Sequence, residues 1–242
     1  MCAQQIPKKL LLHSLKNALP TLTEPKRDSQ RSRRPEMGGC VRRVAATALP
    51  TGWGVFRALG FERPGSSRRP RETAVVLILG NPWRAPSGPA PLVRLHSECL
   101  TGDVLRSLRC DCGEQLELAL RAIAEEGCGL LIYEQKEGRG IGLMAKLRAY
   151  ALQDQGLDTI AANRALGYEA DCRDFSLPGA ILNHLGIRHI RLLSNNPEKR
   201  HALARAGIAV VEQIPCEASP NPWALKYLKT KKERMGHTLS NV

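Results

Sequence analysis

Strand and helix patterns alternate regularly along the second half of the sequence. Short apolar runs typical of buried strands occur at 130–133, 190–193 and 208–212, and stretches with a helical spacing of apolar residues separate them. Glycines such as Gly127 and Gly186 end these helices. Strands joined by helices of about ten residues pair in parallel, because a tight turn cannot join parallel neighbours. The pattern predicts an α/β fold, a layered mixed sheet with parallel βαβ units flanked by helices.

The other expected elements complete one catalytic domain. Further strands are expected at 44–62, 74–80 and 92–96. Helices are expected from Gly113 to Gly127, through Lys146 to Gly156, and at 177–185, 197–206 and 226–237. We expect this domain to span 44–240 and to follow a disordered basic extension over 1–43.

The positive charge of the chain is concentrated near its N-terminus. Lys and Arg outnumber Asp and Glu by 36 to 23, a formal net charge of +13, and residues 1–43 contribute +7 of it. That segment is rich in Pro, Ser, Gln and Arg, so it buries too little apolar surface to offset the entropy of ordering. We therefore expect a disordered extension or a start codon placed too far upstream, with a basic organellar presequence as the alternative.

Apolar runs in the sequence are short. No stretch approaches the ~20 apolar residues that a membrane-spanning helix needs. Leu10, Leu11 and Leu12 are too short a run for the apolar part of a secretory signal, and no small-residue cleavage site follows them. We therefore expect no membrane among the partners and a reducing, cytoplasmic setting. There the eight cysteines are thiols or metal ligands rather than disulfides.

Three of the eight cysteines are clustered. Cys99, Cys110 and Cys112 are spaced C-x10-C-x-C, while the other five are scattered singly. Sulfur ligands suit zinc, and three protein ligands leave a fourth position for water, as in catalytic zinc sites. Zinc lowers the pKa of such a water toward neutrality. Two alternatives remain on spacing alone: three buried thiols, or a structural site completed by a remote Cys or His such as His96.

Polar motifs follow several of the expected strands. Residues 94–98 end one strand, 137–142 follow the next, and 194–199 open a helix. Glycines at 137–142 permit close backbone approach to a phosphate, with Arg139 as a bidentate cation. The helix start at 194–199 could hold an anion through its amides. Each motif by itself also fits a solvated strand end or an ordinary helix cap.

These motifs, in this order, resemble GTP cyclohydrolase II, the family that opens the purine ring of GTP at the start of riboflavin biosynthesis. The resemblance rests on Val93–Asp103, Leu108–Gly113, Glu137–Leu143, Ala149–Gly156, Asp171–Phe175, Leu193–Pro197, Tyr227–Lys231 and Met235–His237. The resemblance covers about residues 44–240. The chain resembles the monofunctional form of the enzyme, which lacks a dihydroxybutanone phosphate synthase domain.

The resemblance implies a zinc-dependent hydrolase with GTP as its substrate. Water attacks C8 of the purine and then hydrolyses the formyl amide, so that formate leaves. Pyrophosphate is also released, and a diaminopyrimidine ribosyl phosphate remains. The resemblance further implies one Zn²⁺ per subunit, Mg²⁺ with the triphosphate, and a homodimer.

Site residues can be carried over one by one onto this sequence. The resemblance places the zinc ligands at Cys99, Cys110 and Cys112. The expected GTP contacts are Arg94, Leu95, His96, Ser97, Glu98, Gln115, Glu137, Gly138, Arg139, Thr159, Ser194 and Lys199. Asp171 matches the proton acceptor, Arg173 the proposed nucleophile, and Tyr150 a tyrosine near the ring chemistry. Because a guanidinium stays protonated at neutral pH, Arg173 could instead stabilise the phosphoryl transition state, and the sequence leaves both roles open.

Two other classes of function fit parts of the sequence. A zinc-containing nucleic-acid-binding protein would explain the charge and the cysteines. However, aromatic residues make up only 4% of the chain, too few for base stacking, and the excess charge lies mainly at 1–43. A relative that binds GTP without completing ring opening would also keep the binding motifs. The presence of Tyr150, Asp171 and Arg173 argues against it, and we expect no nucleic acid partner.

Overall fold

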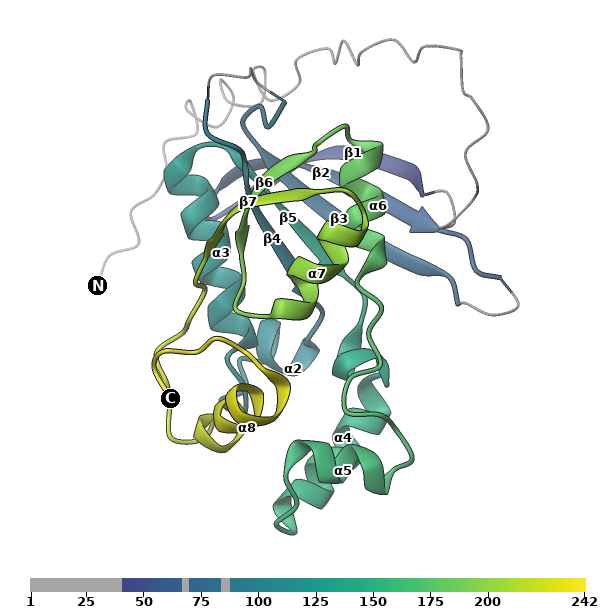
Figure 1. Cartoon of the computed structure of the whole chain (residues 1–242), viewed down its shortest axis with the longest axis vertical. Helices are drawn as coiled ribbons and strands as arrows, with labels where there is room; N and C mark the ends of the chain where they lie inside the picture. The colour runs from purple at the N-terminus through teal and green to yellow at the C-terminus, as the bar shows by residue number, and fades with distance from the viewer. Residues whose placement is uncertain (1–40, 67–69, 84–87) are drawn as a thin grey trace.

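The structure is a computed structural model that describes residues 41–66, 70–83 and 88–242 (Figure 1). In this part of the chain, seven strands form one mixed sheet in the order β1-β2-β3-β5-β4-β6-β7. The strands are β1 (Arg42–Thr51), β2 (Gly54–Arg63), β3 (Glu72–Leu79), β4 (Leu92–Ser97), β5 (Gly129–Glu134), β6 (His189–Leu193) and β7 (Ala209–Ile214). Of the extension expected over 1–43, residues 1–40 lie outside the described residues, but its last three residues are ordered: Val41 is buried and Arg42 and Arg43 begin β1, because their backbones pair with β2.

The sheet has an antiparallel half and a parallel half. Neighbours are antiparallel from β1 through β2 and β3 to β5. From β5 through β4 and β6 to β7 all pairs are parallel, as the alternation of strands and helices predicts. The expected α/β fold with a mixed sheet and parallel βαβ units is therefore confirmed.

Eight helical segments accompany the sheet in the described residues. They are α2 (Leu100–Asp103), α3 (Cys112–Glu126), the 3-10 turn η1 (Glu137–Gly140), α4 (Leu143–Asp154), α5 (Thr159–Ala165), α6 (Ser176–His184), α7 (Pro197–Arg205) and α8 (Leu225–Met235). None of the helices in the described ranges is long and apolar enough to cross a membrane.

Two apolar clusters cover the two faces of the sheet. Leu130 and Ile132 of β5 pack in one cluster with Leu177 of α6 and Leu203 of α7, whereas Leu131 packs in the other, which includes residues of α3. Successive side chains of a strand point to opposite faces. The sheet is therefore sandwiched, with α6 and α7 on one face and α3 on the other (Figure 1).

The remaining helices gather at the end of the sheet where the parallel strands finish. Strand β4 leads into α2, β5 leads into η1 and α4, and β6 leads into α7. In Figure 1, α2, α4, α5 and α8 lie below the sheet at this end. In open α/β sheets, ligands bind beyond the carboxyl ends of the strands. A binding site is therefore expected at this end of the sheet.

Two details of the sequence interpretation need correction. The strand expected at 44–62 is a hairpin of β1 and β2, because the hydroxyl of Thr51 accepts from the Trp53 amide and donates to the Gly54 carbonyl. That pair of hydrogen bonds turns the chain between the two strands. The short segments α2, η1 and α5 were not expected, since helices of one or two turns leave no readable periodicity.

Candidate active site and metal centre

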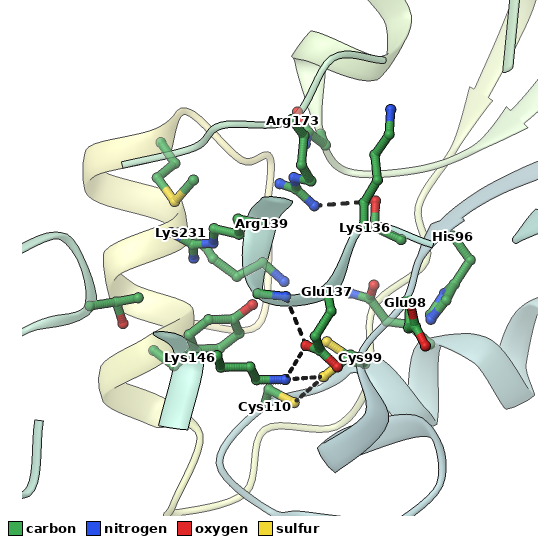
Figure 2. A pocket seen from close by; sticks show the side chains of 18 of the residues that line it. His96, Glu98, Cys99, Cys110, Lys136, Glu137, Arg139, Lys146, Arg173 and Lys231 are labelled. Atoms are coloured by element: carbon green, nitrogen blue, oxygen red, sulfur yellow. Dashed lines mark hydrogen bonds and ion pairs between the residues drawn. The ribbon is translucent and has the colours of Figure 1, made fainter. Parts of the chain in front are cut away.

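A pocket opens at the carboxyl ends of β4, β5 and β6 (Figure 2). Among the site residues expected from the sequence, all but Leu95 and Asp171 line it. Leu95 is buried in the apolar core, and its carbonyl accepts a hydrogen bond from the Lys199 ammonium at 2.7 Å. Asp171 lies beside the pocket and contacts it through Arg173. The fold thus brings together residues that are spread over more than a hundred positions of sequence.

The three clustered cysteines converge in space. The sulfur atoms of Cys99, Cys110 and Cys112 all lie within 4.8 Å of one another, with 3.7 Å between Cys99 and Cys110. A tetrahedral zinc with Zn–S bonds of about 2.3 Å would separate two sulfurs by about 3.8 Å. The spacing therefore fits zinc, and the described residues contain no other group of three such side chains close enough to hold a metal.

The charges of the three thiols are strongly linked. Hydrogen bonds from the Cys110 and Cys112 thiols hold the pKa of Cys99 well below its usual value. Hydrogen bonds to Cys110 and Cys99 raise the pKa of Cys112 well above it. Ionisation of one sulfur therefore disfavours ionisation of the other two, and a divalent cation would offset this repulsion. This donor chemistry fits a soft metal ion.

Glycine at 102 makes room for the sulfur cluster. A Cβ atom on Gly102 would lie 2.9 Å from Sγ of Cys110 and 3.3 Å from Sγ of Cys99. We expect Gly102→Ala to weaken metal binding, since overpacking of this kind costs about 1–3 kcal/mol and would push the sulfurs apart. Metal content after dialysis checks this. The control is Gly52→Ala, where a Cβ would meet nothing within 4 Å; equal metal retention by both variants would contradict the expectation.

Lys146 links the sulfur cluster to the glycine-rich turn after β5. Its ammonium lies 3.1 Å from Sγ of Cys99 and 2.7 Å from Oε1 of Glu137, as Figure 2 shows. The other carboxylate oxygen of Glu137 accepts from the Leu100 amide at 2.7 Å. The carboxylate of Glu137 therefore fixes α2, α4 and its own turn around the cysteines.

His96 is held by a carboxylate outside the cysteine cluster. Its Nε2 lies 3.0 Å from Oδ1 of Asp103, and its ring stacks on Tyr133, whose hydroxyl donates to the same carboxylate. Asp103 also accepts from the Cys99 amide at 3.0 Å. Burial lowers the pKa of His96, so the imidazole is neutral near pH 7. Among the described residues, the side chains close enough together to hold a metal are the three cysteines, and His96 is not one of that group, which argues against His96 as a fourth ligand.

Glu98, two residues after His96, contributes an ionisable carboxyl group to the pocket wall. Partial burial, followed by the charges of Glu137 and Asp103, raises its pKa. A carboxyl group with a raised pKa can hold or release a proton closer to neutral pH. Glu98 therefore has the chemistry of an acid–base group.

Arg173 and Asp171 form a bidentate ion pair. Nε of Arg173 donates to Oδ1 of Asp171 at 2.8 Å and Nη2 donates to Oδ2 at 2.5 Å. Burial alone would lower the pKa of Arg173, but the Asp171 carboxylate holds it above its usual value. Burial likewise would raise the pKa of Asp171, but hydrogen bonds from Arg173 hold it below its usual value. Both groups stay charged at neutral pH.

The turn at 137–142 adopts a strained conformation that places a cation in the pocket. Gly138 and Arg139 both have left-handed backbone angles, with φ of 62° and 60°. Such a conformation at a residue other than glycine costs on the order of 1 kcal/mol and is found where function requires it. Arg139 Nη1 donates to the carbonyl of Ala170 at 3.3 Å, and its guanidinium stacks on Tyr227. The glycine-rich motif thus presents Arg139 rather than serving as a plain loop.

The start of α7 contributes amides and a buried ammonium. Asn196 caps the helix by accepting from the Glu198 amide at 2.9 Å, and the Ser194 hydroxyl accepts from the Asn196 amide at 3.1 Å. Lys199 is buried, and burial together with the charges of Arg94 and Arg173 holds its pKa well below the usual value. This end of the pocket suits an anion. A bound anion would offset the neighbouring positive charges and favour the ammonium form of Lys199.

The other expected site residues form the pocket walls. Arg94 of β4 donates to Oε1 of Gln115 at 2.7 Å and to the Leu193 carbonyl at 3.1 Å. Arg173 Nη1 lies 3.4 Å from the Ser97 hydroxyl. Tyr150 lies 3.5 Å from the Thr101 hydroxyl, and burial raises its pKa, so its phenol stays protonated. Thr159 lines the far side at the start of α5.

Several pocket residues were not expected from the sequence. They include Arg109, Lys136, Lys146, Tyr227, Lys231 and His237. The last three lie on or just after α8, whose helical pattern was readable but whose packing position was not. A signal existed, because the segments around Tyr227 and Met235 belong to the family resemblance, although no role was attached to them. Lys146 had no motif of its own beyond the spacing of its helix.

Sequence comparisons with known proteins find relatives of one family. A sequence profile of the GTP cyclohydrolase II family matches residues 42–215. The GTP cyclohydrolase-2 of Actinobacillus succinogenes is 51% identical over 197 residues, which cover 81% of this chain and 88% of that protein. That of Neisseria meningitidis is 50% identical over 204 residues, 84% of this chain and 100% of that protein. That of Escherichia coli K12 is 52% identical over 201 residues, 83% and 98%.

A solved structure gives a weaker likeness. A two-domain 3,4-dihydroxy-2-butanone 4-phosphate synthase from A. baumannii matches 76% of this chain and 41% of that chain, with a TM-score of 0.40 and 20% identity. A similarity at this level supports no conclusion about function.

Proposed function

The chain belongs to the GTP cyclohydrolase II family, and from this premise we propose that it opens the imidazole ring of GTP with a zinc ion held by Cys99, Cys110 and Cys112. The products are formate, pyrophosphate and a diaminopyrimidine ribosyl phosphate, and Mg²⁺ accompanies the triphosphate. The observation that carries the proposal is the sulfur cluster at zinc spacing in the same pocket as Arg139, Arg173 and Lys199.

Ring opening consists of two hydrolytic steps, attack of water at C8 and hydrolysis of the formyl amide. Cys99, Cys110 and Cys112 would hold the zinc ion, which would lower the pKa of a water molecule and so make a nucleophile available at neutral pH. Around it, Lys146 fixes Cys99, while Glu98 can exchange a proton with the substrate. The protonated phenol of Tyr150 can donate a hydrogen bond to the opening ring.

Release of pyrophosphate needs positive charge where negative charge develops. Arg139, Arg173 and Lys199 line the pocket and supply it. Because Asp171 accepts two hydrogen bonds from the guanidinium of Arg173, we propose that Asp171 orients this group and keeps it charged. A charged guanidinium has no lone pair free for attack, so Arg173 acts as a charge stabiliser rather than as a nucleophile.

The GTP contacts proposed for this pocket are the side chains that line it. They are Arg94, His96, Ser97, Glu98, Gln115, Glu137, Gly138, Arg139, Thr159, Ser194 and Lys199. Leu95 takes part indirectly, because its carbonyl holds the ammonium of Lys199. We also propose a homodimer of this domain, as the family resemblance implies.

The pH dependence of GTP binding is expected to follow Lys199. Its depressed pKa leaves the amine neutral once the pH exceeds that pKa, and a bound triphosphate favours the ammonium form. GTP binding should therefore take up protons, and affinity should fall as pH rises through the pKa of the free protein. Calorimetry on metal-free protein, in buffers of different ionisation enthalpy, measures this uptake. Lys199→Arg should abolish it, and an unchanged pH slope in that variant would contradict the assignment.

The basic extension is expected to be dispensable for catalysis. Deletion of residues 1–40 removes none of the residues that line the pocket, so turnover should stay within a few-fold of the full chain. Steady-state formate release by the two forms is the measurement. A large loss of turnover would show that the extension contributes to the site or to a subunit contact.

The reaction itself is tested by product analysis. Full-length, zinc-replete protein is incubated with GTP and Mg²⁺, and formate, pyrophosphate and the pyrimidine product are measured in parallel. The proposal predicts that all three rise in equal amounts. Pyrophosphate without formate would indicate a relative that hydrolyses the triphosphate but leaves the ring closed.

A further inference from the structure

The C-terminal helix α8 forms one wall of the pocket. Tyr227, Lys231, Met235 and, just after the helix, His237 line it. In Figure 2, α8 is the pale yellow helix that carries Lys231 toward Arg139. The family profile matches residues 42–215, and the resemblance read from the sequence continues through Tyr227–Lys231 and Met235–His237.

Lys231 makes a buried ion pair with Asp111. Its Nζ lies 3.0 Å from Oδ1 and 3.1 Å from Oδ2 of that carboxylate. The two residues are only 7% and 3% exposed, although 120 positions of sequence separate them. Removing one partner from such a pair leaves an uncompensated buried charge, which strongly disfavours the original geometry.

Asp111 stands between two of the cysteines, Cys110 and Cys112. It occupies the position just before α3, where an aspartate side chain usually accepts from the first amides of the helix. In the described chain its carboxylate caps no amide of α3 and instead receives Lys231 and the Gln115 side chain, the latter at 2.5 Å. The carboxylate therefore serves the turn between the cysteines rather than the helix end.

The contact continues from the turn into the substrate pocket. Gln115 donates to Asp111 through Nε2 and accepts from Arg94 through Oε1. One chain of polar contacts thus runs from α8 through the turn between Cys110 and Cys112 to β4. A displacement of the Asp111 carboxylate would therefore shift both neighbouring cysteines and the side chain of Gln115.

Helix α8 has other attachments that do not involve Lys231. Lys226 donates to the carbonyls of Gly156 and Leu157, and Arg234 pairs with Asp158 at 2.5 Å. Thr238, beyond the helix, exchanges backbone and side-chain hydrogen bonds with Asn195. Because these contacts hold the helix at both ends, the pair of Lys231 with Asp111 is not required merely to dock it.

We propose that Lys231 is a positioning residue of the metal centre. It fixes the Asp111 carboxylate and thereby the turn that presents the Cys110 and Cys112 sulfurs. The inference rests on the proposed zinc site, which the C-terminal helix thereby completes from outside the cysteine motif. A residue that supports a metal ligand in this way typically changes metal affinity by about 10- to 100-fold when it is replaced.

The first test compares zinc affinity in full-length variants. Lys231→Met should weaken zinc binding by about 10- to 100-fold in competition with a chromogenic chelator. Lys229→Met is the matched control, because Lys229 is exposed on the same helix, and it should bind zinc like the wild type. Equal zinc affinity in Lys231→Met and the wild type overturns the inference. Failure of the wild type to bind zinc overturns the proposed function instead.

The second test needs no metal. In metal-free protein, Lys231→Met should accelerate the reaction of Cys110 and Cys112 with a thiol reagent, while the reaction of the remote Cys128 stays unchanged. If Lys231 acts through Asp111, the acceleration should nearly vanish when Lys231→Met is made on an Asp111→Asn background. An undiminished effect there, or uniform acceleration of all thiols, means loosened folding and contradicts the positioning role.

Discussion

Replacement of Cys110 by Ser should abolish bound zinc and formate release together. A neutral hydroxyl replaces a thiolate ligand, and the remaining sulfurs of Cys99 and Cys112 cannot form a three-ligand site. Loss of the metal removes several kcal/mol of catalysis, so the rate of formate release should fall by roughly 10³-fold or more. Metal analysis of the purified variant and a formate assay on the same sample are the measurements.

The matched control for this substitution is Cys128→Ser. Cys128 lies outside the sulfur cluster and is only half-buried, so the same chemical change should leave zinc content and rate close to wild type. A Cys110→Ser protein that is free of zinc and still releases formate would show that the metal has no part in ring opening.

Replacement of Arg173 by Met should lower the rate of pyrophosphate release by roughly 10²- to 10³-fold, the usual effect of losing one preorganised donor to a developing charge. The loss also removes the two side-chain hydrogen bonds to the Asp171 carboxylate and leaves it only the one from the backbone amide of residue 173. Arg173→Lys keeps the charge but not the bidentate geometry, so it should recover part of the rate. Steady-state rates of pyrophosphate and formate release check both variants.

The two roles for Arg173 differ in what a quenched reaction contains. As a charge stabiliser, Arg173 carries no nucleotide at any stage. Wild-type protein mixed with GTP labelled in the ribose should therefore yield no labelled protein after an alkaline quench, in which a phosphorus–nitrogen bond survives. Label that accumulates on Arg173 during the first turnover would establish the nucleophilic role instead.

Local patterns in the sequence were sufficient for the main features of the fold. The apolar runs at 92–96 and 130–133 form the adjacent parallel strands β4 and β5. The three closely spaced cysteines form a sulfur cluster. Both features depend on residues close in sequence, or on the general rule that strands joined by helices pair in parallel. Such rules do not require knowledge of side-chain packing.

Features that depend on distant contacts could not be predicted in this way. The periodicity at 226–237 predicted a helix but not that Lys231 would meet a carboxylate 120 positions earlier. Asp111 before a helix favours a capping role by its position, whereas tertiary contacts commit its carboxylate to the turn between the cysteines. The sequence also left His96 open as a metal ligand, whereas in the fold its Nε2 contacts Asp103 of α2 and the metal-competent group consists of the three cysteines.

The hairpin of β1 and β2 could not be predicted from the sequence for a different reason. Strand β2 contains Val55, Phe56 and Phe61, but β1 has few residues that favour strands, so apolar periodicity does not separate the two strands between 44 and 62. The turn depends on two hydrogen bonds of the Thr51 hydroxyl, a local feature that apolar periodicity does not register.

The central claim is that ring opening of GTP depends on zinc held by the three cysteines, and a metal titration tests it most directly. Zinc is added stepwise to metal-free, full-length protein in the presence of GTP and Mg²⁺, and the rate of formate release is measured at each step. We predict that the rate rises in proportion to zinc and reaches its plateau at one ion per chain. Formate release at the full rate before any zinc is added would contradict the claim.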